Sequence, residues 1–211
     1  RTGKLKSAAK IKGMLMHNFR VIDTPNADQS LTPSNHHIEA QSVDDGMARY
    51  RDLLPEKVRK DAVHAIDYMI TTSPESTAEV NKKTLEEGYR WLCDKHGKEN
   101  IIMASEHHDE TTPHLHVLVM PLLNDKLNAK HFIGGTKHRL SEMQTEFHDR
   151  LIERGIEIDR GIKGSKAHHQ TIKQYYSKLN NDVEQVPKLT EEDLEQKVLD
   201  PRNLKEKIIR A

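Results

Sequence analysis

Hydrophobic and polar residues alternate over two short segments near the middle of the chain, which predicts a pair of β-strands. In the first segment, residues 100–107, one face carries Ile101, Met103, Ser105 and His107. In the second, residues 114–119, one face carries His114, His116 and Leu118, and the other carries Leu115, Val117 and Val119. The link between them is turn-like, and Pro113 suits the first residue of a strand. We therefore expect a hairpin in which His107 lies across from His114 and His116.

The rest of the chain interleaves helical and extended patterns. Apolar spacing and end signals predict helices over residues 44–54, 77–96, 141–154 (with Ser141 as N-cap) and 168–179. Residues 62–72 predict a further strand, 126–132 and 156–158 short extended pieces, and 4–19 either a helix or extended chain. Beyond residue 180 the composition becomes acidic and polar, with a linker at 187–190 followed by helix. These patterns predict an α+β fold with a central antiparallel β-sheet flanked by helices.

Length and composition set the class of protein. The 211 residues allow one large domain, or a domain with an appendage. No run of 18 apolar residues occurs, so we expect no membrane span. The single cysteine, Cys93, cannot form an internal disulfide and is typical of a reducing compartment. We therefore expect a soluble, cytoplasmic protein.

Charge is unevenly distributed, although the formal net charge is zero. Residues 1–20 contain no acid and carry Arg1, Lys4, Lys6, Lys10, Lys12 and Arg20. Residues 160–179 also contain no acid and carry Arg160, Lys163, Lys166, Lys173 and Lys178. Such segments are typical of surfaces that contact phosphate groups, and the alternative is that they are ordinary solvated faces.

Three imidazoles converging on one point fit a divalent cation such as Zn²⁺ or Mn²⁺, with open positions for a substrate. A cation beside basic surfaces indicates phosphodiester chemistry, in which it would act as a Lewis acid on a phosphate oxygen. Because the chain holds 14 histidines, a polar hairpin with incidental histidines is the alternative.

Two residues are candidate nucleophiles. His17 precedes Arg20 by three residues, and an imidazole nitrogen can attack phosphorus if a carboxylate such as Glu110 orients or deprotonates the other nitrogen. Arg20 could hold the adjoining phosphate. The second candidate is Tyr175, where Lys178 would help to lower the pKa of the phenol from its usual value of about 10.

Three motifs carry a resemblance to a known family. The segment His107–His116 resembles the H-x-D-E-x-x-P-H-x-H motif of the MobV (Mob/Pre) family of plasmid mobilization relaxases. His17-Asn18-Phe19-Arg20 is similar to the family's H-N-x-R, and Asn26-Ala27-Asp28 to its N-x-D loop. Their order and spacing agree over roughly residues 1–179. The chain also resembles the wider HUH endonuclease superfamily, which implies the sandwich fold of an HUH relaxase.

The resemblance implies an enzyme that binds the origin of transfer on plasmid DNA, cleaves one strand and later rejoins the ends. By motif, His17 matches a nucleophile that keeps the 5′ phosphate as a phosphoramidate, Glu110 an activating carboxylate and Arg20 a residue near the scissile phosphate. The matched metal ligands are His107, His114 and His116. Mn²⁺ or Mg²⁺ is the usual metal, and Zn²⁺ or Ni²⁺ would also suit three imidazoles. Expected DNA contacts are Arg1, Lys4, Lys6, Lys10, Lys12, Asn26, Asp28, Arg160, Lys163 and Lys166.

The resemblance also implies the domain organisation and partners. Residues 1–180 are interpreted as the catalytic domain and 181–211 as a helical C-terminal extension. Family members have a short strand that would precede Arg1, and a long helical dimerisation region that would follow Ala211. Relaxosome or coupling proteins are expected partners, and the full-length protein is expected to dimerise.

Two other functions fit parts of the sequence. Rolling-circle replication initiators use a tyrosine in a U-x-x-Y-x-x-K pattern, and Ile172–Lys178 fits it with Tyr175 as the nucleophile. A non-catalytic DNA-binding module with a structural metal would close the site with a fourth ligand, such as His108 or Asp109. Strand cleavage, and the residue that carries the covalent adduct, distinguish the three functions.

Overall fold

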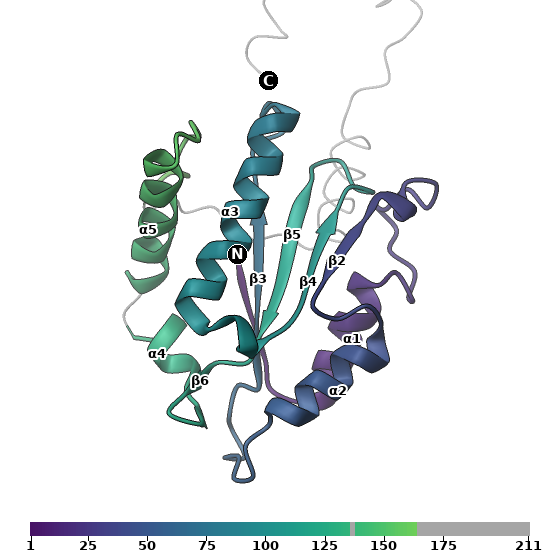
Figure 1. Ribbon diagram of the computed structural model, residues 1–211, viewed down its shortest axis with the longest axis vertical. Helices are drawn as coiled ribbons and strands as arrows, with labels where there is room; N and C mark the ends of the chain where they lie inside the picture. The colour runs from purple at the N-terminus through teal and green to yellow at the C-terminus, as the bar shows by residue number, and fades with distance from the viewer. Residues whose placement is uncertain (136–137, 164–211) are drawn as a thin grey trace, which may run out of the picture. The chain divides into compact units, whose positions relative to one another are not determined.

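The sheet at the centre of the protein has five antiparallel strands in the order β1-β3-β5-β4-β2, and helices lie against both of its faces (Figure 1). The computed structural model describes residues 1–135 and 138–163. The strands are β1 (Thr2–Leu5), β2 (His36–Ile38), β3 (Ala65–Thr71), β4 (Ile101–His107) and β5 (His114–Val119). This arrangement confirms the predicted α+β class.

Five α-helices surround the sheet in the described residues: α1 (Ala8–Asn18), α2 (Val43–Leu53), α3 (Ala78–His96), α4 (Ala129–Ile133) and α5 (Arg139–Glu153). The side chains of Ser7, Ser42 and Thr77 each accept a backbone N–H at the start of α1, α2 and α3. Short 3₁₀ turns span Thr32–Ser34 and Lys98–Asn100, and a small hairpin joins β6 (Leu122–Leu123) to β7 (Lys126–Leu127). None of the helices in the described residues is long and apolar enough to cross a membrane.

An apolar core lies between each face of the sheet and the helices that cover it. Leu115, Val117 and Val119 of β5 pack with residues of α3, α4 and α5 on one face of the sheet. Leu118, the alternate residue of β5, packs with α1 and α2 residues on the other face. The period of two along β5 therefore decides which helices each side chain meets, and the predicted alternation is confirmed.

Close packing sets the position of α1, the helix that carries His17. A Cβ at Gly46 of α2 would lie only 2.7 Å from Cδ2 of Leu15, which is fully buried in α1. The two helices can approach this closely because residue 46 has no side chain.

The central hairpin has the predicted register. His107 pairs with His114, and Ser105 pairs with His116. The turn between β4 and β5 lies at the upper end of the sheet in Figure 1. All three predicted histidines therefore approach one end of one sheet face.

Several local expectations differ from the structure. The pattern of residues 4–19 is compatible with either a helix or extended chain, and in the structure Thr2–Leu5 form the edge strand β1 while Ala8–Asn18 form α1. Residues 129–133 form a helix instead of an extended piece, since the Asn128 side chain accepts the backbone N–H of His131. Residues 156–158 form no strand.

The start of α5 was also predicted wrongly. The helix begins at Arg139, and Ser141 lies inside its first turn instead of capping it. The Ser141 hydroxyl and carbonyl instead accept the guanidinium of Arg160 at 3.1 and 2.9 Å. The expected helix at 168–179, with Tyr175, and the extension at 181–211 lie outside the described residues.

Candidate active site

Three histidine rings gather at the upper end of β4 and β5. The centroid of the His107 ring lies 5.0 Å from that of His114 and 5.7 Å from that of His116, and the last two are 5.3 Å apart. All three residues are buried. The hairpin register brings them together, because His107 faces His114 directly and His116 follows two residues later on the same face.

Hydrogen bonds fix which nitrogen two of the rings present. Nδ1 of His114 lies 3.0 Å from the carbonyl oxygen of Thr112, and Nδ1 of His116 lies 2.9 Å from Oδ1 of Asp67. Both partners only accept at these atoms, so each Nδ1 carries the proton and each Nε2 keeps a lone pair. This is the arrangement of a metal-binding histidine oriented by an outer carboxylate or carbonyl.

Asp67 did not emerge from the sequence as a site residue. It lies in β3 and is buried beside His116. The sequence does contain one indication of it: Asp67 is the single acid within the apolar strand segment 65–70, and a buried carboxylate at such a position requires a polar partner.

Arg20 and Asp109 form the electrostatic centre of the site. Arg20 Nε and Nη2 donate to Asp109 Oδ2 and Oδ1 at 2.9 and 2.6 Å. Asp109 Oδ2 also accepts from Thr32 and Asn35. The hydrogen bond from Arg20 is the main reason that the pKa of Asp109 lies well below its usual range. The Arg20 side chain is only 7% exposed, and its guanidinium donates to the carboxylates of both Asp109 and Glu110.

His107 also meets Arg20. Arg20 Nη2 lies 2.7 Å from His107 Nδ1, and burial, followed by the charge of Arg20, lowers the pKa of His107 to about 2. A guanidinium only donates, so the neutral ring carries its proton on Nε2, which is buried and has no hydrogen-bond partner among the described residues. Binding a cation through Nε2 requires the other tautomer, and Arg20 would then release Nδ1 while keeping its carboxylate partners.

Glu110 joins the histidines. Its Oε1 accepts from Arg20 at 2.9 Å, its Oε2 accepts from Asn26 at 2.7 Å, and Oε1 lies 3.8 Å from His114 Nε2. His107, Glu110 and His114 each offer a ligand atom within 4.8 Å of the others. This group differs from the predicted set, in which His116 was the third ligand. Imidazole nitrogens with a carboxylate oxygen fit a divalent cation such as Mn²⁺ or Zn²⁺, and so does a buried His107 Nε2 that has no partner in the described part of the chain.

His17 lies beside this cluster, at the end of α1. The centroid of its ring is 6.3 Å from that of His107 and 6.1 Å from that of His116, and its Nδ1 is 3.5 Å from the hydroxyl of Thr24. Burial, followed by the charge of Arg20, lowers the pKa of His17. A neutral ring is the form that can attack phosphorus. Within the described residues no hydrogen bond joins Glu110 to His17.

The loop between α1 and β2 is fastened to the hairpin turn. The backbone N–H of Asp28 donates to the carbonyl of Asp109 at 2.7 Å, and Asn26 binds Glu110. The carboxylate of Asp28 is exposed and accepts from the N–H and hydroxyl of Ser30. The predicted DNA contacts Asn26 and Asp28 therefore also position the loop.

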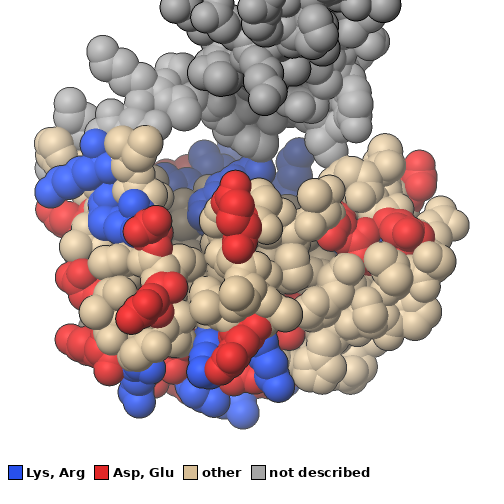
Figure 2. All heavy atoms as spheres, turned by 90° about the horizontal axis from the view of Figure 1, so that it is seen from above, with Lys and Arg blue, Asp and Glu red and all other residues tan. Residues whose placement is uncertain are grey.

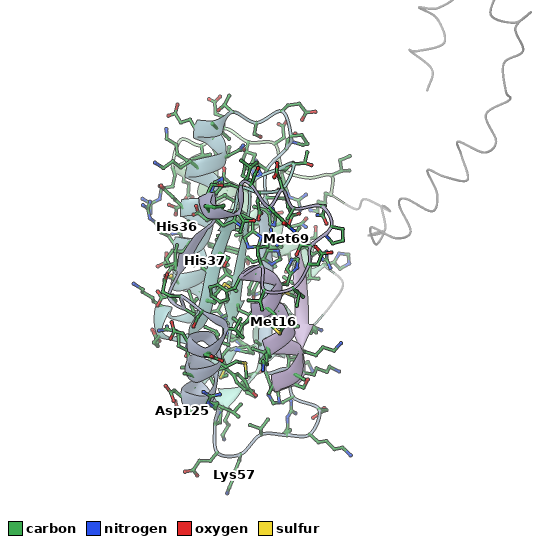
Figure 3. The ribbon with its side chains drawn as sticks, turned by 90° about the vertical axis from the view of Figure 1, so that its right-hand side faces the viewer. Met16, His36, His37, Lys57, Met69 and Asp125 are labelled. Carbon is green, nitrogen blue, oxygen red and sulfur yellow. The ribbon has the colours of Figure 1, made fainter. Side chains whose placement is uncertain are left out.

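The predicted basic residues have different surroundings. Six of the predicted DNA contacts have exposed side chains: Arg1, Lys4, Lys6, Lys10, Lys12 and Lys163. Arg160 instead donates to Ser141 and Thr145, and Lys166 lies outside the described residues. Basic and acidic side chains are interspersed over the face that Figure 2 shows. In Figure 3, Lys57 and Asp125 lie in the lower part of the view, below Met69, the residue paired with His116.

Comparison with solved structures identifies the class of fold. The MobM relaxase domain (MOBV; Mob_Pre), bound to manganese and to a 22-nucleotide origin-of-transfer DNA of plasmid pMV158, matches with a TM-score of 0.72 and 25% identity. The match covers 84% of this chain and 97% of that domain. The same domain bound to a 26-nucleotide DNA matches with a TM-score of 0.60. The chain therefore has the fold of a relaxase domain.

The sequence comparisons identify the family. A family model described as a plasmid recombination enzyme (Mob_Pre) matches residues 1–177, so the chain belongs to the Mob/Pre family. Plasmid recombination enzyme type 3 of Mammaliicoccus lentus is 30% identical, with 84% of this chain and 47% of that protein covered. Type 2 of Staphylococcus aureus is 29% identical, with 87% and 46% covered. The chain thus spans about half the length of these relatives.

Proposed function

We propose that the chain is the catalytic domain of a relaxase that nicks and rejoins one strand of plasmid DNA at an origin of transfer. The observation that carries the proposal is the position of the His17 ring, 6.3 and 6.1 Å from two rings of a buried histidine cluster. A nucleophile beside a candidate cation site is the constellation that phosphodiester transfer requires. Family membership and the DNA-bound MobM relaxase domain support this function.

The candidate cation donors are His107, His114 and Glu110. His116 lies beside them, and its ring is oriented by the hydrogen bond to Asp67. Mn²⁺ is the proposed cation, with Mg²⁺ as its substitute, since the related MobM domain is Mn-bound. Zn²⁺ and Ni²⁺ would also suit the imidazoles. A cation held here would supply Lewis-acid polarisation of a phosphate oxygen.

The chain's own residues would perform the transfer. Because Nδ1 of His17 faces Thr24, Nε2 is the nitrogen available to attack the phosphorus. The P–N bond forms as the P–O3′ bond breaks, the departing 3′ oxygen gains a proton, and loss of the Nδ1 proton neutralises the ring. The 5′ phosphate stays on His17 as a phosphoramidate, and attack by the 3′ hydroxyl reverses the step. Arg20 and Glu110 orient the hairpin turn and balance charge around the histidines.

Neither of the two residues expected to close a purely structural metal site is free to do so. His108 is exposed, and the Asp109 carboxylate is occupied by Arg20, Thr32 and Asn35, so neither closes the site as a fourth ligand. Relaxosome or coupling partners and dimerisation of the full-length protein remain predictions from the resemblance, and a cytoplasmic location remains a prediction from the composition.

The test is cleavage of single-stranded oligonucleotides that tile the replicon carrying the gene, with Mn²⁺ present. Wild type, His17→Ala and Tyr175→Phe would be compared, and each covalent adduct would be exposed to acid. The proposal predicts an acid-labile adduct that is lost in His17→Ala and kept in Tyr175→Phe. An acid-stable adduct lost only in Tyr175→Phe would indicate a tyrosine initiator. DNA binding by the wild type without cleavage would indicate a binding module.

A further inference from the structure

The loop between α1 and β2 carries an unusual share of exposed aliphatic side chains. The exposed large hydrophobic residues in the described part of the chain are Val21, Ile22, Leu31, Leu140, Ile152 and Ile162. Three of the six belong to this loop, where Val21 is 61%, Ile22 40% and Leu31 48% exposed. Clustered exposed apolar side chains mark binding surfaces more often than isolated ones do.

Val21 and Ile22 lie beside His17. The backbone N–H of Val21 donates to the carbonyl of Met16, which places Val21 directly after the last turn of α1. The hydroxyl of Thr24 is 3.5 Å from His17 Nδ1 and donates to the carbonyl of Ile22 at 3.4 Å. The two aliphatic residues therefore occupy the short segment that joins His17 to Thr24.

Leu31 lies on the returning arm of the same loop. Its backbone N–H donates to the carbonyl of Asp28, whose own N–H donates to the carbonyl of Asp109. The next residue, Thr32, donates to the Asp109 carboxylate. Leu31 is thus held near the Arg20 and Asp109 pair. Its side chain is exposed although hydrogen bonds hold its loop at several points.

We propose that Val21, Ile22 and Leu31 form a surface that contacts the bases flanking the scissile phosphate. This inference rests on the proposed function, because a phosphate held at His17 brings the adjoining nucleotides against the loop. Phosphate contacts carry no sequence information, whereas apolar side chains pack on base faces and on the thymine methyl group. The occupant is single-stranded DNA, since Val21 and Ile22 lie in the segment between His17 and Thr24, and Leu31 is tied through Asp28 to Asp109.

The experiment measures binding of single-stranded origin DNA that carries 2-aminopurine at successive positions around the nick. Val21→Ser, Ile22→Ser, Leu31→Ser and the triple variant would be compared with wild type. Ile152→Ser, which replaces an equally exposed aliphatic residue on α5, is the matched control. Thermal unfolding of each variant checks the fold, and the oligomeric state would be measured in the same samples.

The inference predicts that the triple variant binds roughly ten-fold or more weakly, with an unchanged dependence on salt. It also predicts a changed 2-aminopurine signal only next to the nick, while Ile152→Ser behaves as wild type. The inference would be overturned if the triple variant bound DNA as tightly as Ile152→Ser. It would also be overturned if the triple variant changed only the oligomeric state, because that result would indicate a protein interface. Wild type that binds DNA without nicking would refute the proposed reaction alone, whereas absence of any binding would refute both.

Discussion

Arg20 and Asp109 are 89 residues apart in the chain and form a two-point ion pair, with Nε–Oδ2 and Nη2–Oδ1 distances of 2.9 and 2.6 Å. Arg20 follows the helix that carries His17, and Asp109 lies in the turn between His107 and His114. The pair therefore holds the proposed nucleophile and the histidine cluster in one relative position. Because the Asp109 side chain is fully buried, the interaction is shielded from solvent.

Removing the carboxylate should destabilise the fold. Asp109→Ala leaves the buried guanidinium with Glu110 as its remaining carboxylate partner and also orphans Asn35. We expect the free energy of unfolding to fall by about 3 kcal/mol or more, as for other broken buried pairs. Urea denaturation would measure the change, with Asp28→Asn, which alters an exposed carboxylate in the loop between α1 and β2, as control. Equal stability of the two variants would show that the pair contributes little.

Asp67 should control the affinity for metal through His116. Asp67→Ala removes the acceptor that keeps the His116 proton on Nδ1, so the ring loses its fixed orientation. Loss of such an outer partner typically weakens metal affinity by about 10- to 100-fold. Titration calorimetry with Mn²⁺ would measure this, and Asp61→Ala, which alters an exposed acid, is the control. Unchanged affinity would mean that His116 does not take part in binding the cation.

Two helical glycines should respond in opposite directions to alanine. Gly46→Ala places a Cβ 2.7 Å from Cδ2 of buried Leu15 and should destabilise by about 1–3 kcal/mol through overpacking. Gly13→Ala, in α1, meets no atom within 4 Å and should stabilise by about 0.5–1 kcal/mol through helix propensity. Thermal or chemical unfolding would measure both. A stabilised Gly46→Ala would show that α1 and α2 are not held as closely as described.

Stability should fall in acid partly through His96. Burial lowers the pKa of His96 to about 3, and the positive charges of Lys95 and His131 add to the shift. Its Nε2 lies 2.9 Å from the Tyr68 hydroxyl. The unfolded chain, with a usual histidine pKa of about 6.5, binds the proton first as the pH falls. Stability from this residue is therefore complete above about pH 6.5 and declines toward pH 3, by up to about 1.4 kcal/mol per pH unit.

Comparison with His96→Gln isolates that contribution, since every other group titrates in both proteins. We expect the wild type to lose its stability advantage over His96→Gln progressively below pH 6.5. A difference in unfolding free energy that stays constant between pH 7 and pH 4 would contradict the buried, neutral assignment.

The residues that could be predicted from sequence are those whose pattern is local. The alternation in residues 114–119 indicates which face each side chain takes, and the turn before Pro113 indicates the hairpin, so His107 and His114 were paired correctly. Asp67 and Asp109 act through partners distant in sequence, which no local pattern records. Ser141 has the residue type of an N-cap, but Arg160 binds it from outside the helix.

The central claim is that His17 carries the DNA. The most direct measurement is mass spectrometry of the covalent adduct, formed with Mn²⁺ and a single-stranded origin oligonucleotide and digested at neutral to alkaline pH. We predict that the nucleotide-bearing peptide contains His17 and that the modification releases in acid. A modified peptide containing Tyr175, or any residue other than His17, would contradict the account.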